Sequence, residues 1–399
     1  MTKSALTASN RIASIDIFRA LTMVVMIFVN DLWSLKDIPE WLGHMPAKYD
    51  GMGLADVVFP VFLFIVGLSV PHAIKARQKK GQSDSQIAGH VLLRAFALLV
   101  MGVFIVNFEN INARLMPVSR QVWEILMIVG FFLIWNIYPK SGFFEKIRPY
   151  WFQIAGVVLL IILAIIYKGG SAENPTWMKR HWWGILGLIG WAYLVSATIY
   201  IVSNGKLVWV VIGWFLLMLL NLNEAKPLFE GAPKFRIIVG ASNHALVMSG
   251  VLATVIYERL KLKNYGYYAI AGVLLACGVI LTIYGFSIRP FGGISKIYAT
   301  PSWTSICAGI SFAAFGILYL IADKFGYTKW ADIIAPAGRS TLTCYLVPYV
   351  VYPIMVMVGF KLPAFFTTGG IGLIKAAIFA LLIVGITALL ERINVRLKI

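Results

Sequence analysis

The side chains best suited to acid–base chemistry lie in one polar stretch near the start of the chain. It holds a single histidine, His44, and five of only 17 acidic residues: Asp31, Asp37, Glu40, Asp50 and Asp56. Near neutral pH an imidazole can take a proton from a nucleophile or briefly carry an acyl group. A carboxylate that accepts a hydrogen bond from the second ring nitrogen would orient it. A lone loop histidine is usually plain surface, but this acidic setting makes His44 a candidate catalytic residue.

Two residues that flank His44 each have a functional and a structural interpretation. Asn30 ends the apolar run before the loop, where its amide could orient a substrate or stabilise an oxyanion. It could equally cap the end of a helix. Asp56 opens the next apolar run, where it could orient the His44 imidazole or cap the helix it begins.

The elements that must position these residues are membrane-spanning helices. The chain is 60% hydrophobic and 13% charged, about half the usual charged share of a soluble domain. Continuous apolar runs near the ~20 residues needed to cross a bilayer recur throughout, which favours helices over a β-barrel. We therefore predict an all-α, polytopic transmembrane bundle. The predicted spans are 15–33, 53–74, 88–107, 119–138, 150–167, 182–202, 206–222, 242–258, 265–286, 302–322, 340–359 and 369–390. These are twelve, or eleven if the short seventh is not a span.

Charge gives the orientation of the bundle. The net charge is +18, and the positive residues lie mostly in short loops, where headgroups and insertion bias account for them. Their distribution predicts cytoplasmic termini and an outer His44 loop, and no nucleic-acid partner is expected. We read no metal-ligand spacing, P-loop or nucleophile elbow in the sequence.

Other candidates are ionisable or aromatic residues within or beside spans, where charge is costly and so often functional. Arg19 could pair with Asp16 or help to hold an anionic cofactor. Arg94 and Arg120 lie within spans, and Arg120 could pair with Glu124. Such polar helix faces line cavities or make interhelical hydrogen bonds, and the residues leave both open. Four further residues are placed on the outer side: Asp31, His244, Lys296 and Trp303.

The order of short motifs around His44 resembles a known family. SIDIFRAL, MIFVN, GH, DG and ADVVFPVFLFIVGLSV follow one another over residues 14–70. In this order they resemble the heparan-α-glucosaminide N-acetyltransferase family of multi-span acyltransferases, in particular its bacterial NagX branch. The resemblance covers about 100 N-terminal residues, with weaker echoes to the end. Ala20 departs from a glycine usual in the family, and the fourth span reads SRQVWEIL instead of the family's signature.

The resemblance implies a reaction and roles for residues. The family takes acetyl-CoA from the cytoplasm and acetylates the amine of a terminal glucosamine on the far side. It implies that His44, Asn30 and Asp56 are catalytic. The basic residues expected to hold the donor are Arg19, Arg94, Arg120 and Lys296. Those expected near the acceptor are Asp31, Asp50, His244 and Trp303.

The prediction is thus a single transmembrane acyltransferase domain over residues 1–399, with its motif region at 11–107, in the bacterial cytoplasmic membrane. Its expected partners are acetyl-CoA, an amino sugar and membrane lipid, with a homodimer left open and no metal. Two alternatives remain at this point. One is a permease for N-acetylglucosamine or a related amino sugar. The other is an O-acetyltransferase of an envelope glycan.

Overall fold

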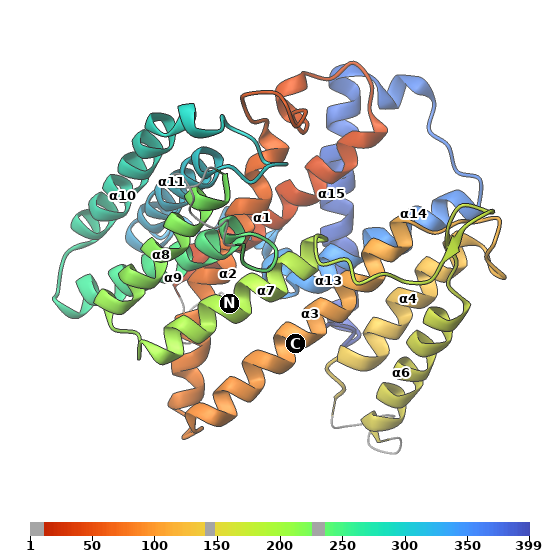
Figure 1. Ribbon diagram of the computed structural model, residues 1–399, viewed down its shortest axis with the longest axis horizontal. Helices are drawn as coiled ribbons and strands as arrows, with labels where there is room; N and C mark the ends of the chain where they lie inside the picture. The colour runs from red at the N-terminus through yellow and green to blue at the C-terminus, as the bar shows by residue number, and fades with distance from the viewer. Residues whose placement is uncertain (1–11, 140–147, 226–235) are drawn as a thin grey trace. The chain divides into compact units, whose positions relative to one another are not determined.

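The structure, a computed structural model, describes residues 12–139, 148–225 and 236–399 and is built of α-helices (Figure 1). Among those residues, nine helices are long and apolar enough to cross a membrane. This confirms the prediction of an all-α polytopic membrane protein. The nine helices are α1 (Ala13–Asp31), α2 (Leu54–Gln78), α3 (Asp84–Glu109), α6 (Pro149–Ile166), α7 (Ile185–Val202), α8 (Leu207–Ala225), α10 (Tyr267–Ser287), α11 (Pro301–Leu318) and α15 (Gly369–Arg392).

Three more predicted spans coincide with helices that are shorter or more polar. They are α4 (Arg120–Trp135), α9 (Ala241–Leu262) and the consecutive α13 (Thr341–Leu346) and α14 (Pro348–Met357). A short helix, α12 (Ala335–Arg339), precedes α13, and a two-stranded antiparallel hairpin joins β1 (Gly169–Gly170) to β2 (Pro175–Thr176). Every predicted span therefore has a helix, while the number that cross a bilayer stays a prediction.

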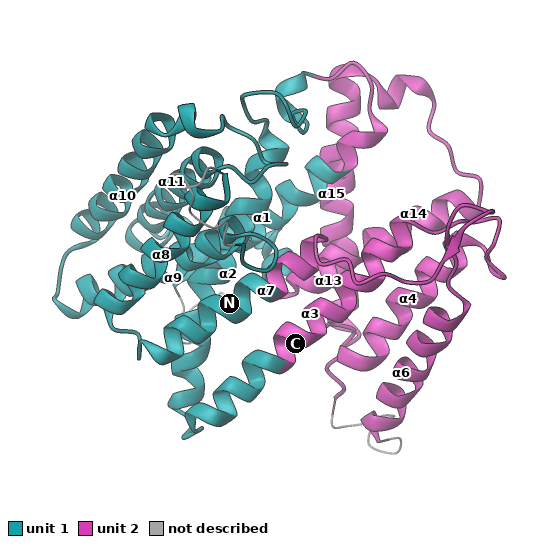
Figure 2. Cartoon of the chain, viewed as in Figure 1, with its two compact units in different colours: residues 1–30, 39–92, 191–338 teal, residues 31–38, 93–190, 339–399 magenta. Residues whose placement is uncertain are grey.

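The chain divides into two compact units, each described here by itself (Figure 2). Unit 1 comprises residues 1–30, 39–92 and 191–338, and unit 2 comprises residues 31–38, 93–190 and 339–399. Each unit is therefore assembled from segments that are distant in the sequence.

In unit 1, α2 packs closely along α9 because a glycine on each helix faces the backbone of the other helix. A Cβ atom at Gly67 of α2 would overlap the carbonyl oxygen of Val247, and one at Gly250 of α9 would overlap that of Phe64. Small residues allow such close helix approach in membranes, where packing rather than hydrophobicity drives association. This contact fixes α2, the helix whose first turn carries Asp56.

In unit 2, α4 packs between α6 and α14 around a buried aromatic cluster. The Trp123 ring stacks with Phe104 and Phe108 of α3, and its Nε1–H donates to the Leu163 carbonyl oxygen at 3.1 Å. The indole is fully buried, so its one polar atom is satisfied as burial requires.

Candidate functional site

The site is centred on a buried carboxylate and the imidazole that it holds. Asp56 lies in the first turn of α2 and is 2% exposed, whereas the His44 side chain is 55% exposed. His44 Nδ1 lies 2.7 Å from Asp56 Oδ1. The backbone N–H groups of Met45 and Gly53 both donate to Asp56 Oδ2 at 3.0 Å. One carboxylate therefore fixes the imidazole, the residue that follows it and the start of α2.

These contacts set which nitrogen of His44 can act as a base. The charged carboxylate of Asp56 has only acceptor atoms, so the His44 nitrogen that faces it must carry the proton. With the proton on Nδ1, the lone pair of a neutral imidazole is on Nε2. Because the ring is half exposed, a substrate can reach Nε2 once the amine of Lys296, which lies 3.4 Å from it, moves aside. The pair thus has the geometry of an oriented general base.

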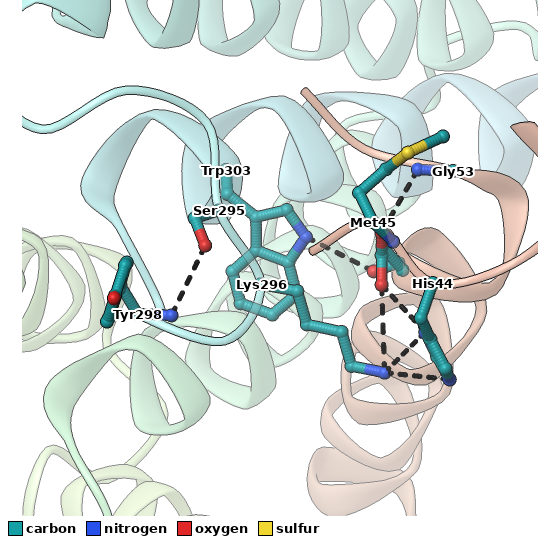
Figure 3. A network of polar contacts seen from close by, with 8 residues as sticks. His44, Met45, Gly53, Ser295, Lys296, Tyr298 and Trp303 are labelled. Carbon is teal, nitrogen blue, oxygen red and sulfur yellow. Dashed lines mark hydrogen bonds and ion pairs between the residues drawn. The ribbon is translucent and has the colours of Figure 1, made fainter. Parts of the chain in front are cut away.

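Lys296 brings an amine against this pair. It belongs to the loop between α10 and α11, and its Nζ lies 3.1 Å from His44 Nδ1 and 3.4 Å from Nε2 (Figure 3). The same nitrogen lies 3.9 Å from Asp56 Oδ1. Burial lowers the pKa of Lys296, and the negative charge of Asp56 opposes that change. Of the four basic residues predicted to hold the donor, Lys296 is the one that the structure places on His44.

Asp50 joins the His44 loop to the Lys296 loop. The Ile294 N–H donates to Asp50 Oδ1 at 2.7 Å, and Arg289 Nε donates to Oδ2 at 2.9 Å. Ser295 Oγ adds a hydrogen bond to the Ala47 carbonyl oxygen at 3.1 Å. The hydrogen bond from the Ile294 backbone, supported by Arg289, holds the pKa of Asp50 below its usual range. We call these contacts the Asp50 clamp, because they fix Lys296 relative to His44.

We expect Asp50→Ala to lower kcat for acetyl transfer, the reaction that the motif resemblance implies, by about 10- to 10²-fold, since small displacements of reacting groups cost this much. KM for the donor should change less. Asp50→Asn should restore most of kcat, because its amide oxygen can still accept from Ile294. Steady-state kinetics test this, with the exposed Glu40→Ala as the control. An equal loss of kcat in Asp50→Ala, Asp50→Asn and Glu40→Ala would exclude the clamp.

Gly53 is needed because the His44 loop passes against the start of α2. A Cβ atom there would overlap the carbonyl oxygen of Gly43 and lie 2.9 Å from that of Trp41. We expect Gly53→Ala to destabilise the fold by about 1–3 kcal/mol and to lower kcat, because the loop must move away from Asp56. Gly89→Ala is the control, since its Cβ would meet nothing. Thermal unfolding and kcat measured on both variants check this, and equal behaviour would contradict it.

Two residues predicted near the acceptor are buried in unit 1. Trp303 is 2% exposed and its Nε1–H donates to the Asp56 carbonyl oxygen at 3.2 Å. Its ring supports the first turn of α2 instead of offering a surface for a sugar. His244 of α9 is fully buried, and its Nε2 lies 2.8 Å from the Ile238 carbonyl oxygen.

Asp31, also predicted near the acceptor, belongs to unit 2 and has a different setting. Its fully buried carboxylate accepts hydrogen bonds from Lys375 Nζ at 2.8 Å and Tyr352 Oη at 2.7 Å. Lys375 also donates to Ser34 Oγ at 2.9 Å. The Asp31 carboxylate is thus occupied by protein groups. Asn30 lies exposed in the last turn of α1, and its role stays a proposal.

The other three residues predicted to bind the donor have contacts of their own. Arg19 forms the expected ion pair with Asp16 at 3.0 Å and also donates to Ser69 Oγ at 2.8 Å. Arg94 is half-buried in α3, and Arg120 places its guanidinium 4.5 Å from the centre of the Phe108 ring. Both belong to unit 2. Among the described residues, no group of three or more His, Cys, Asp or Glu could hold a metal ion.

Sequence reasoning missed the groups that complete the site. The backbone donors of Met45 and Gly53 cannot be identified from side-chain type. The Arg289–Asp50 pair joins residues 239 apart in the chain. One available signal was the Gly292–Gly293 turn, where both glycines have positive φ (+140° and +70°), which glycine alone adopts readily.

Comparison with known proteins covers the part of the chain that carries His44 and Asp56. Residues 11–167 match the family model described as heparan-alpha-glucosaminide N-acetyltransferase, catalytic. The protein of that name from Mus musculus is 33% identical over 127 residues, which is 31% of this chain and 17% of the relative. The Homo sapiens protein is 32% identical over 124 residues, or 30% of this chain and 16% of the relative.

The aligned stretch is thus about one sixth of each relative's length, and the family-model match includes neither Lys296 nor Arg289. The family expected from the motif order is confirmed for this stretch. Residues 11–167 thus resemble the catalytic region of the heparan-α-glucosaminide N-acetyltransferases.

Proposed function

We propose that this protein is a membrane N-acetyltransferase that moves an acetyl group from acetyl-CoA to the amine of glucosamine or a related amino sugar. The observation that carries the proposal is the His44–Asp56 pair. A half-exposed imidazole is held by a buried carboxylate within the segment that matches the acetyltransferase family. We place the protein in the bacterial cytoplasmic membrane, with the donor arriving from the cytoplasm.

The chemistry follows from the orientation of the imidazole. As the acceptor amine attacks the thioester carbonyl carbon, a C–N bond forms and the C–S bond breaks. His44 Nε2 takes the proton that the amine loses and passes it to the departing thiolate of CoA. Asp56 stabilises the imidazolium formed in between, as the acidic residue of a catalytic triad does. A positive charge on Lys296 is suited to stabilise the oxyanion that develops on the carbonyl oxygen.

Asn30 and the basic residues complete the proposal. We assign Asn30 to orienting the amine or polarising the thioester carbonyl. Arg19 lies in the N-terminal half of α1, the half that the charge distribution predicts to face the cytoplasm, where a guanidinium favours the phosphates of CoA. Transfer can be direct or through an acetyl group on His44, and single-turnover trapping of acetyl-histidine separates the two.

The experiment is an assay of purified protein in liposomes with acetyl-CoA and glucosamine. We expect N-acetylglucosamine and free CoA thiol to appear in equal amounts. A hydroxylamine-labile ester product would instead indicate O-acetylation. Accumulation of sugar inside the vesicles without acetyl-CoA, unaffected by His44→Ala, would replace the enzyme with a permease.

A further inference from the structure

The amine of Lys296 occupies the place against His44 that an external amine would need. Its Nζ lies within 3.4 Å of both ring nitrogens, including Nε2, the proposed base. It is the same functional group as the proposed acceptor, a primary amine on an aliphatic carbon. Its side chain is 28% exposed, so a donor that reaches His44 also reaches Lys296.

The backbone of Lys296 is held in place by contacts of its loop, so the position of its amine does not depend on side-chain conformation alone. The Asp50 clamp holds the neighbouring residues Ile294 and Ser295 to the His44 loop. The loop also returns a hydrogen bond, from Gly51 N–H to the Ile294 carbonyl oxygen at 3.0 Å. These contacts hold the Lys296 backbone beside the imidazole, and such proximity turns a slow bimolecular reaction into a fast local one.

We propose that Lys296 is an internal acetyl acceptor, which becomes N-acetylated when donor is bound and no external amine is present. This rests on the proposed function, because the acetyl donor must reach His44. The neutral Lys296 amine attacks the thioester carbonyl carbon, a C–N bond forms, and the C–S bond breaks. One amine proton passes to His44 Nε2 and then to the CoA thiolate. The products are N-acetyl-lysine and CoA, with no further reactant.

Three consequences follow from this chemistry and from the burial of Lys296. The amide formed is stable, so it removes the positive charge beside Asp56 and blocks the site. An acceptor sugar that binds against His44 must displace Lys296 and so protect it. Since burial lowers the pKa of Lys296, its neutral form is present at lower pH than for an exposed lysine. Its modification should therefore persist at pH values where exposed lysines react little.

The test is peptide mass spectrometry of the full-length protein after incubation with acetyl-CoA in the absence of sugar. We expect the mass increment of one acetyl group on Lys296, reduced at least about 10²-fold in His44→Ala. Lys48, exposed in the same loop, is the internal control for direct chemical acetylation and should be equal in both proteins. In the wild type, saturating glucosamine should lower modification of Lys296 and leave Lys48 unchanged.

The outcomes separate this inference from the function on which it rests. A preparation that acetylates glucosamine but leaves Lys296 unmodified overturns the inference and keeps the function. Modification of Lys296 that is equal with and without His44, or that glucosamine does not reduce, is direct chemistry and also overturns it. A preparation that acetylates neither glucosamine nor Lys296 overturns both.

Discussion

Replacing His44 with alanine is expected to lower kcat for acetyl transfer by about 10²–10⁴-fold, the usual contribution of a general base. The His44 side chain is half exposed, so its removal leaves no cavity and the fold should persist. Tm in detergent should stay close to that of the wild type. The exposed His90→Ala in α3 is the matched control and should keep full kcat.

Asp56→Asn tests the His44–Asp56 pair more specifically. Both backbone donors to this side chain, from Met45 and Gly53, point at Oδ2. An asparagine would therefore keep its oxygen at that position and turn its NH₂ toward His44. Nδ1 must then accept, the proton moves to Nε2, and the base is lost although the loop stays in place. We expect a fall in kcat of similar size to that in His44→Ala. Full kcat in either variant would exclude the His44–Asp56 pair as the proton acceptor.

The largest expected effect on stability comes from Lys375 in unit 2. Its ammonium, 18% exposed, faces the fully buried Asp31 carboxylate at 2.8 Å. Lys375→Met leaves that charge with Tyr352 Oη and no cation, and breaking a buried pair in this way costs about 3–5 kcal/mol. Thermal or denaturant unfolding in detergent should show the loss of stability directly.

The double variant distinguishes charge from packing at this position. Asp31→Asn together with Lys375→Met removes both charges, and the amide can still hydrogen-bond Tyr352. We expect it to recover most of the loss, because a neutral replacement of a buried ion pair is often tolerated. Lys361→Met, at an exposed loop position in the same unit, should be neutral. If the double variant is as unstable as Lys375→Met, the effect comes from packing and the ion-pair explanation is wrong.

The fold was largely predictable because apolar length is a local property of the sequence. Each predicted span falls on a helix, including 119–138 on α4 and 340–359 on α13 and α14. Backbone groups in a bilayer must bond within their own segment, so a long apolar run becomes a helix whatever its neighbours. The division into two units was not predictable, because it depends on which helices pack together across gaps of more than 90 residues.

For the candidate site, the sequence by itself determined the loop, the histidine and the family. His44 and Asp56 stand twelve residues apart on one connection between two helices, so their meeting is a local event. The tertiary structure alone decided the rest, since it joins the 288–300 loop to the His44 loop. It placed Lys296 on the imidazole rather than with Arg19, made Asp50 a clamp, and buried Trp303 under Asp56. Residue type and spacing alone do not reveal such contacts, because the contacts arise when distant helices pack and bring their connecting loops together.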